Sequence, residues 1–349
     1  MKYQRDILKD VHGYTPGEQL NVPDIIKLNT NENPYPPSPK VGEALAAMTG
    51  DNFRKYPDPL SVKFRRLCAE RYGYDSEDWV MAGNGMDELL AMTLRTFVDP
   101  GATVLSVNPT YSLYEILVQL HGAQYATLDL GDDGSLPEAL YSADGALCFV
   151  PRPNAPTGLS ASRASMERLC ESFKGIVYID EAYVDFAEDS CMDFPKRYDN
   201  VIVGRTFSKS FGLAGMRIGV AVANPAIIAE FMKTKDSYNL NGASQAAGIA
   251  AMQDYAYMEA QAEKIKATRV RMTAGLRTLG FEVQDSQSNF VLARWNATPC
   301  AKDIFTKLRD EAILVRYFEL EGLENALRIS VGTEAETDAL LNALAYLQD

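Results

Sequence analysis

The stretch RTFSKSFGLAGMRIG, residues 205–219, leads from one short apolar run, Val201–Val203, into another, Ile218–Ala223. Both runs are rich in β-branched residues, which is typical of buried strands. The turn between them places Lys209 between two serines and then passes through several glycines. Glycine has no Cβ, so the backbone can approach a ligand closely there. The stretch therefore predicts a strand, a ligand-binding turn with a lysine, and a second strand.

Upstream of this turn, similar apolar runs alternate with segments of helical periodicity. The runs are Thr103–Val107, Ala146–Val150 and Ile176–Ile179, and apolar residues at helical spacing fill residues 60–72 and 86–97. Alternation of strand and helix is typical of a mostly parallel sheet covered by helices on both faces. We therefore expect a large α/β domain.

The pattern changes after residue 240. Residues 243–279 predict one or two long helices, and shorter elements follow: strands at 289–293, 313–317 and 327–331, with helices near 300–311 and 335–348. These elements predict a smaller α+β domain. The expected division is an N-terminal arm with the start of the small domain over residues 1–40, the large domain over 41–245, and the small domain over 246–349. Prolines between residues 34 and 39 predict an extended arm.

Composition narrows the classes of partner. The chain has 349 residues, and 34 Lys and Arg against 47 Asp and Glu give a net charge of −13. An acidic chain is a poor partner for nucleic acid or an anionic membrane. No stretch approaches the roughly 20 apolar residues of a membrane span, and the first 20 residues lack the apolar segment of a secretory signal. We expect a cytoplasmic protein.

Few side chains suit histidine or cysteine chemistry. The two histidines, His12 and His121, are isolated, and the five cysteines are far apart. A histidine-based metal site or a Ser–His triad is therefore not expected, and we predict no metal. Any catalysis must come from Lys, Asp, Tyr and Arg, or from a cofactor.

Polar residues follow the predicted strands at their carboxyl ends, where ligands collect in open parallel sheets. Asp180 ends the run 176–179, Asn154 lies in the turn after the run 146–150, and Gly85 opens the helix at 86–97. Each position also has an ordinary structural interpretation: a helix N-cap for Asp180, and Pro- or Gly-containing turns for the others. The combination is more informative than any one of them.

Together these groups match the needs of pyridoxal 5′-phosphate. An amine such as Lys209 can bond to its aldehyde, and a carboxylate such as Asp180 can keep the ring nitrogen protonated. Arg217, Ser208 and a helix N-terminus suit a phosphate. Tyr183 could reach the 3′ oxygen of the ring, and Tyr111 could stack on the ring face.

The same motifs resemble those of the fold-type I pyridoxal-phosphate-dependent aminotransferases. Ser208-Lys209, Gly215–Gly219, Asn154–Gly158 and Asp180–Tyr183 carry the broad resemblance. A narrower resemblance, to the histidinol-phosphate aminotransferases within that family, is carried by residues 28–35, 54–59, 83–88, 315–318 and 327–333. With Tyr14, the matching positions run to Thr333, nearly the whole chain. Met86 and Ala155 depart from the usual residues of the family.

The resemblance implies roles for the cofactor site. Lys209 would carry the cofactor and later move a proton at the substrate's Cα, while Asp180 pairs with the ring nitrogen. Tyr183 and Asn154 would bind the 3′ oxygen, and Tyr111 would stack. The groups implied for the phosphate are Ser208, Arg217, the backbone of Gly85, Met86 and Asp87, and Tyr56 from the other subunit of a homodimer with shared active sites.

The resemblance also implies a substrate site. Arg328 would hold the substrate's carboxylate or lie near the amino-alcohol end, and Tyr14, Asn33, Arg316 and the partner's Tyr238 would complete the site. The alternative for Arg328 is a structural salt bridge at a strand edge, and for Tyr14 an arm residue packed on the core.

Four functions remain open at this stage. The first is an aminotransferase of histidine biosynthesis that converts imidazole acetol phosphate and glutamate to histidinol phosphate and 2-oxoglutarate. The second is an aromatic amino acid aminotransferase, the third a threonine-phosphate decarboxylase, and the fourth a non-enzymatic cofactor-sensing domain. The substrates of the first three are small amino donors and 2-oxo acids, so the activity measured with each donor separates them.

Overall fold

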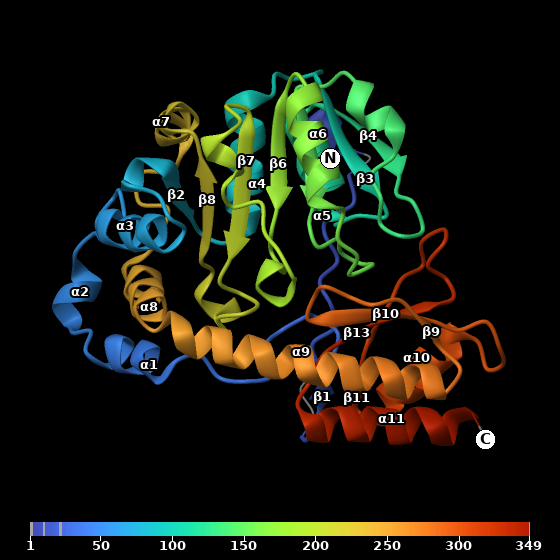
Figure 1. The fold of residues 1–349 in the computed structure, drawn as a ribbon. Coiled ribbons are helices and arrows are strands. Elements are labelled where there is room, and N and C mark those ends of the chain that lie inside the picture. The colour runs from blue at the N-terminus through green and yellow to red at the C-terminus, as the bar shows by residue number, and fades with distance from the viewer. Residues whose placement is uncertain (1–2, 10, 21–22, 349) are drawn as a thin grey trace.

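The computed structural model describes residues 3–9, 11–20 and 23–348, and it is built on a seven-stranded sheet (Figure 1). The strand order is β2-β8-β7-β6-β5-β3-β4, and only β8 runs against the others. The strands are β2 (Val80–Gly83), β3 (Thr103–Asn108), β4 (Gln124–Asp129), β5 (Leu147–Pro151), β6 (Ile176–Asp180), β7 (Val201–Thr206) and β8 (Gly219–Ala223). The predicted mostly parallel sheet is confirmed.

Helices cover both faces of this sheet because the central strands are apolar on both sides. In β5, Phe149 packs into one buried cluster and Cys148 into the other, as the alternation of side chains along a strand requires. The covering helices are α3 (Val62–Arg71), α4 (Met86–Phe97), α5 (Leu113–His121), α6 (Arg163–Ser172), α7 (Pro225–Thr234) and α8 (Gly242–Gln253). α4, α5 and α7 cover one face; α3, α6 and α8 contribute to the cluster on the other.

A second, antiparallel sheet of four strands lies at the carboxyl ends of β6 and β7 (Figure 1). Its order is β12-β13-β10-β9, and α10 and α11 accompany it. The bounds are β9 (Glu282–Val283), β10 (Phe290–Arg294), α10 (Ala301–Asp310), β12 (Arg316–Tyr317), β13 (Ala326–Ser330) and α11 (Glu334–Gln348). The strand predicted at 313–317 is two short pieces, β11 (Ile313–Leu314) and β12, which belong to different sheets.

The N-terminal arm joins this second unit. β1 (Ile26–Lys27) pairs in parallel with β11, and the chain then continues through α1 (Pro39–Ala46) and α2 (Gly50–Arg54). The long region predicted as one or two helices is two, α8 and then α9 (Tyr255–Thr278), which runs beneath both sheets in Figure 1. The division at residues 40 and 245 stays a prediction.

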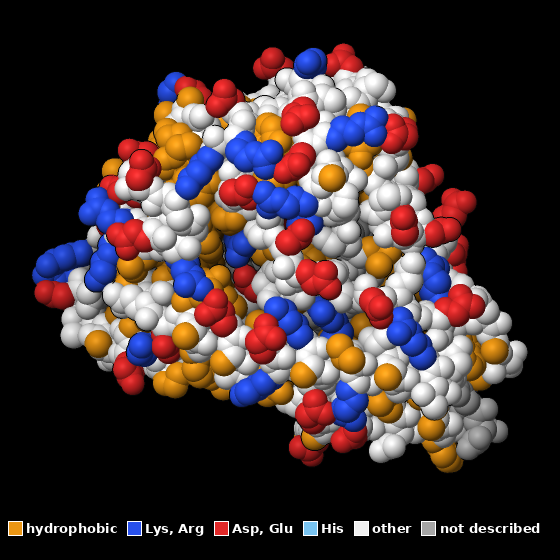
Figure 2. Space-filling view, viewed as in Figure 1, with side chains coloured by type: hydrophobic (Ala, Val, Ile, Leu, Met, Phe, Trp, Pro, Cys, Tyr) orange, Lys and Arg blue, Asp and Glu red, His pale blue; other side chains and the backbone are white. Residues whose placement is uncertain are grey.

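Short 3₁₀ turns complete the description: η1 (Asp6–Leu8), η2 (Glu77–Trp79), η3 (Glu138–Ser142), η4 (Val184–Phe186), η5 (Phe194–Lys196) and η6 (Ala214–Met216). None of the described helices is long and apolar enough to cross a membrane. On the face seen in Figure 2, acidic and basic side chains are mixed over the surface, so the net charge of −13 does not gather in one patch there.

Candidate active site

Figure 1 shows the carboxyl ends of β6 and β7 facing the second sheet. The candidate catalytic residues Asp180 and Lys209 end or follow these two strands. Lys209 follows β7, and its Nζ donates to the carbonyl oxygen of Thr30 at 3.1 Å. The same Nζ lies 5.6 Å from the centre of the Tyr183 ring. Among the described residues Lys209 has no carboxylate within ion-pair distance. Its amine is therefore held by a neutral acceptor of the N-terminal arm.

Asp180, at the end of β6, is buried and carries two hydrogen bonds. Its Oδ1 accepts from the backbone N–H of Ala182 at 3.0 Å, and its Oδ2 accepts from the hydroxyl of Tyr114 at 2.6 Å. Burial raises the pKa of Asp180 to about 6, even though both hydrogen bonds act in the opposite direction. A cationic partner stabilises the ionised form of such a carboxyl group, which burial alone disfavours.

The turn predicted to bind a phosphate lies where α4 begins. Gly85 directly precedes the helix and has a φ of +85°. The first N–H groups of α4, which have no partner within the helix, therefore lie in the turn that is predicted to bind a phosphate. The side chain of Arg217 lies over this turn and contacts both Ser208 Oγ at 3.4 Å and Asp87 Oδ2 at 3.0 Å. A Cβ at Gly85 would lie 2.6 Å from Arg217 Nη2. The backbone conformation favours glycine here, because residues with a Cβ rarely adopt a φ of +85°.

The turn fits a phosphate group chemically. Helix N-terminal N–H groups and a guanidinium are the usual ligands of such an anion. The Arg217–Asp87 ion pair is exposed on both sides, so its contribution to stability is small. Arg217 can therefore turn from Asp87 to an incoming anion at little cost.

Aromatic and amide groups line the space between the two sheets. Tyr183 accepts a hydrogen bond from Asn31 Nδ2 at 3.0 Å, and its ring packs edge-on against Phe290 of β10 at 5.0 Å. Tyr111 packs edge-on against Tyr14 at 5.9 Å. The alternative prediction, that Tyr14 is an arm residue packed on the core, is confirmed in part: its ring contacts Tyr111, but 43% of the residue stays exposed.

Two arginines face each other across β12 and β13. Arg316 and Arg328 are direct partners in the strand register, and like charges opposite one another destabilise a sheet. Burial lowers the pKa of Arg328, and Arg316 adds to that effect. Arg328 donates to the carbonyl of Asn29 at 2.9 Å, but its buried Nε has no partner. A salt bridge for Arg328 is not found among the described residues.

Other predicted residues are engaged in holding the backbone. Asn154 donates to the carbonyl of Pro109 at 3.0 Å and accepts from Thr157, so it organises its own turn. Asn33 donates to the carbonyl of Ser210 at 2.8 Å, which braces the residue after Lys209. Their roles toward a cofactor or substrate stay predictions.

Tyr56 and Tyr238 lie on the surface and stack on each other. Their ring centres are 4.3 Å apart, and they are 80% and 43% exposed. The predicted roles of both require a partner subunit and are not tested within one chain.

A buried ionic network, which the sequence did not indicate, joins the loops that follow Asp180 and Lys209. Arg205 of β7 contacts Glu181 at 3.1 Å and Asp185 at 3.0 Å, and Asp185 also accepts from the hydroxyl of Ser210. Burial alone would lower the pKa of Arg205, but the two carboxylates raise it. Since Glu181 follows Asp180 and Ser210 follows Lys209, the network fixes both loops to one guanidinium.

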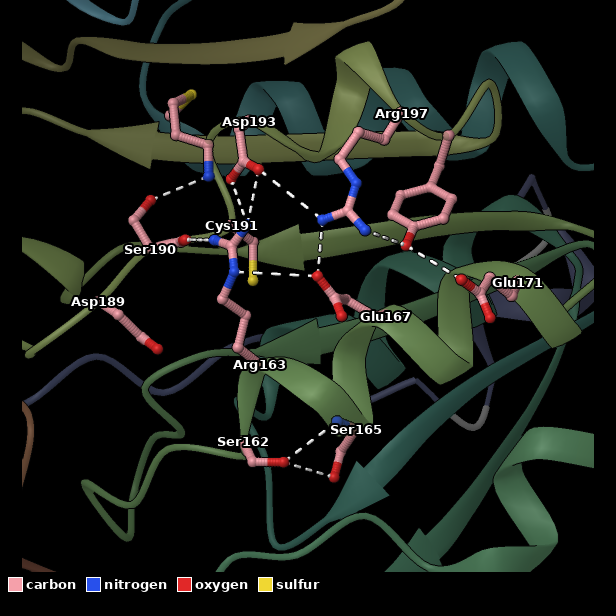
Figure 3. Close-up of polar contacts among 12 residues, drawn as sticks. Ser162, Arg163, Ser165, Glu167, Glu171, Asp189, Ser190, Cys191, Asp193 and Arg197 are labelled. Carbon is pink, nitrogen blue, oxygen red and sulfur yellow. Dashed lines mark hydrogen bonds and ion pairs between the residues drawn. The ribbon is translucent and has the colours of Figure 1, made fainter.

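The network is supported from outside by the segment after η4. Ser190 donates to Glu181 at 2.8 Å, and its carbonyl accepts from Arg163 of α6. Figure 3 shows Arg163 between Ser190 and Asp193, next to the Glu167–Arg197 pair. These surface ion pairs hold in place a loop whose serine completes the buried network.

Comparison with known proteins identifies the family. The model of the family "Aminotransferase class I and II" matches residues 23–344. A histidinol-phosphate aminotransferase of Crocosphaera subtropica is 44% identical over 347 residues, 99% of this chain and 98% of the relative. One of Geobacter sp. is 43% identical over 348 residues, 98% of each.

Comparison with solved structures shows the same fold. The histidinol-phosphate aminotransferase of Sinorhizobium meliloti in complex with pyridoxal-5'-phosphate is 28% identical, with a TM-score of 0.85 over 92% of this chain and 90% of that one. An L-threonine-O-3-phosphate decarboxylase of Porphyromonas gingivalis has a TM-score of 0.82 at 22% identity, over 93% of this chain and all of that one, and shows the shared fold alone. The family and fold predicted from the sequence are confirmed, and the chain belongs to the class I and II aminotransferases, a family of pyridoxal-phosphate-dependent enzymes.

Proposed function

We propose that the protein is a histidinol-phosphate aminotransferase, which transfers an amino group from glutamate to imidazole acetol phosphate. The observation that carries the proposal is the pair Arg316 and Arg328. The two arginines are opposite each other in the strand register, and the buried Nε of Arg328 has no partner among the described residues. In the described part of the chain neither arginine forms an ion pair with a carboxylate, and two such cations favour doubly anionic ligands. The substrates of this reaction carry carboxylates or a phosphate. The relatives with over 40% identity support the same choice.

The residues at the carboxyl ends of β6 and β7 fit pyridoxal phosphate. The turn before α4, with Ser208 and Arg217, is assigned to its phosphate, and Asp180 to its ring nitrogen. Lys209 is assigned to its aldehyde carbon. When bound, the cofactor supplies an electron-withdrawing ring that stabilises negative charge at the substrate's Cα.

The protein's own groups then perform the remaining work. Lys209 moves the proton at the substrate's Cα, because its amine can release and take up a proton, whereas the guanidiniums of the site stay protonated. Arg328 and Arg316 orient the substrate through its anionic groups, and the contact between Arg316 and the carbonyl of Thr15 at 3.4 Å brings the N-terminal arm to the same place. Asp180 remains ionised while it faces a protonated ring nitrogen.

Turnover of a panel of amino donors at matched concentrations tests the substrate. We expect histidinol phosphate with 2-oxoglutarate to be consumed far faster than phenylalanine or tyrosine, and Arg316→Ala to reduce kcat/KM for histidinol phosphate by about 10- to 100-fold, as loss of a charged contact does. Turnover of aromatic amino acids alone, or release of CO₂ from threonine phosphate, would contradict the proposal.

One observation favours aromatic amino acids as a second candidate. The guanidinium of Arg328 lies 5.3 Å from the Phe290 ring and 5.5 Å from the Phe318 ring, and Tyr14 and Tyr111 are close enough to act on it electrostatically. An aromatic wall beside an arginine also suits a side chain such as that of phenylalanine. The same panel separates the two, because aromatic donors would not respond to Arg316→Ala.

The proposal extends to assembly and location. Phe53 and Leu60 are 69% and 46% exposed on either side of Tyr56, and exposed apolar residues that gather in one place are typical of an interface. We assign this surface to a homodimer with shared active sites. All five cysteines are free thiols, which suits the reducing cytoplasm.

A further inference from the structure

Tyr114 of α5 lies beneath the candidate cofactor site and has no role in the function proposed above. Its ring is fully buried, stacked on Phe149 at 4.8 Å and edge-on to Tyr111 at 5.6 Å. Its hydroxyl donates to Asp180 Oδ2 at 2.6 Å, a length typical of a hydrogen bond to a charged oxygen. The stacking fixes the ring, so the hydroxyl is held at the carboxylate rather than brought there by chance.

The surroundings of Asp180 give this hydrogen bond its importance. The charged groups that face the carboxylate are Asp87 of α4 and Glu181 of the following loop, and both are acidic. Besides Tyr114, Ala182 is the group that donates to it. Burial and both acidic neighbours favour the protonated form of Asp180, and the two donors favour the ionised form.

We propose that Tyr114 is a positioning residue that holds Asp180 ionised and aimed at the ring nitrogen of the cofactor. The inference rests on the proposed cofactor site. Tyr114 itself does not touch the ring in this proposal: it acts through Oδ2 of the aspartate, and Oδ1 is held separately by the backbone. Removal of its hydroxyl would leave the ring stack in place and weaken one specific contact, the one between carboxylate and ring nitrogen.

A pair of ligands isolates that contact. The full chain, freed of cofactor, is titrated with pyridoxal phosphate and with its 1-deaza analogue, in which a C–H replaces the ring nitrogen, and the dissociation constants are measured by fluorescence quenching. For Tyr114→Phe we expect weaker binding of pyridoxal phosphate, by about tenfold for a lost hydrogen bond to a charged group. Binding of the deaza analogue should not change. A merely structural role would weaken both ligands alike.

Tyr178→Phe is the matched control. Tyr178 is equally buried in the same aromatic cluster on β6, and its hydroxyl contacts Met86 Sδ at 3.0 Å instead of Asp180. This variant should leave the preference for pyridoxal phosphate over the deaza analogue unchanged. In Asp180→Asn, the further change Tyr114→Phe should also leave it unchanged, because the carboxylate is already gone.

The outcomes separate the inference from the proposed function. If the wild-type chain does not bind pyridoxal phosphate, the proposed function fails. If it binds and Tyr114→Phe weakens both ligands equally, or neither, the inference is overturned. A measurement on the wild type stands apart from the folding of that variant: the Tyr114 hydroxyl proton should resonate far downfield in the proton NMR spectrum and vanish in Asp180→Asn. Its absence from the wild type would also overturn the inference.

Discussion

At the scale of single residues, the site is built from groups that the fold holds at a free-energy cost. Asp180 is a buried acid with acidic neighbours, and Arg328 is a half-buried cation opposite another cation. Each is stabilised when a ligand of opposite charge arrives. Residues that are destabilising in the free protein and favourable in the complex are typical of binding sites.

Asp180→Asn should stabilise the cofactor-free protein. An unfolded aspartate loses its proton near pH 4, whereas the folded protein keeps this proton until about pH 6, so stability from this group falls as pH rises between those values. Asparagine does not titrate in this range. The free energy of unfolding of Asp180→Asn should therefore exceed that of the wild type by a difference that grows with pH above 4 and reaches about 3 kcal/mol at pH 7. Urea unfolding at several pH values measures it.

The control for that experiment is Asp144→Asn, at an exposed position. This change removes a carboxylate that is not buried, so it should not reproduce the stabilisation expected for Asp180→Asn. A wild-type chain whose stability does not fall between pH 4 and pH 6 relative to Asp180→Asn would contradict the prediction.

Residues differ in how far the sequence reveals them. Lys209, Asp180 and the turn at Gly85 follow strands or open a helix, so their place at the sheet edge follows from the chain itself. Tyr114 meets its partner across 66 residues, and nothing in its local pattern separates it from an ordinary helical tyrosine. Arg205 lies within the quoted stretch, but its two carboxylate partners come from a different loop.

At the scale of elements, the start of α4 carries the phosphate proposal. Gly85→Ala forces a side chain into a backbone conformation with φ +85° and places its Cβ against Arg217. We expect a loss of about 1–3 kcal/mol in unfolding free energy from the strain and weaker binding of pyridoxal phosphate. Equilibrium unfolding and a cofactor titration measure the two effects.

Gly101→Ala is the matched control. Gly101 has the same φ of +85°, but nothing lies within 4 Å of a Cβ there. It should show the loss of stability without the loss of cofactor affinity. Equal effects of both variants on cofactor binding would argue against a phosphate site at the start of α4.

The elements that the sequence predicts well are those buried on both faces. β3, β5, β6 and β7 read as continuous apolar runs, whereas in the edge strand β4 Tyr125 and Leu128 are partly buried and the other residues are exposed. A largely exposed strand at a sheet edge gives a weak signal. The predicted strand at 313–317 was wrong as a single element because β11 pairs with the N-terminal arm and β12 with β13. Such a division depends on distant partners.

At the scale of the whole molecule, the apolar surface around α2 predicts assembly. Phe53→Glu introduces a charge into this surface and should convert a dimer to monomers, with loss of activity if sites are shared. Sedimentation equilibrium and the turnover assay measure the two. Val270→Glu, at a position on α9 that is 68% exposed, should change neither. A wild-type protein that sediments as a monomer would contradict the assignment.

The arm near Asn31 has a consequence for synthesis on the ribosome. The backbone of Asn31 is held by Ser330 and Asn289, and the carbonyl of the preceding Thr30 accepts from Lys209. The segment around Asn31 can therefore take its final position beside Lys209 only after residues almost 300 positions later have been synthesised. A nascent chain can fold its seven-stranded sheet early, but the contacts around Lys209 are complete only after nearly all of the chain has been translated.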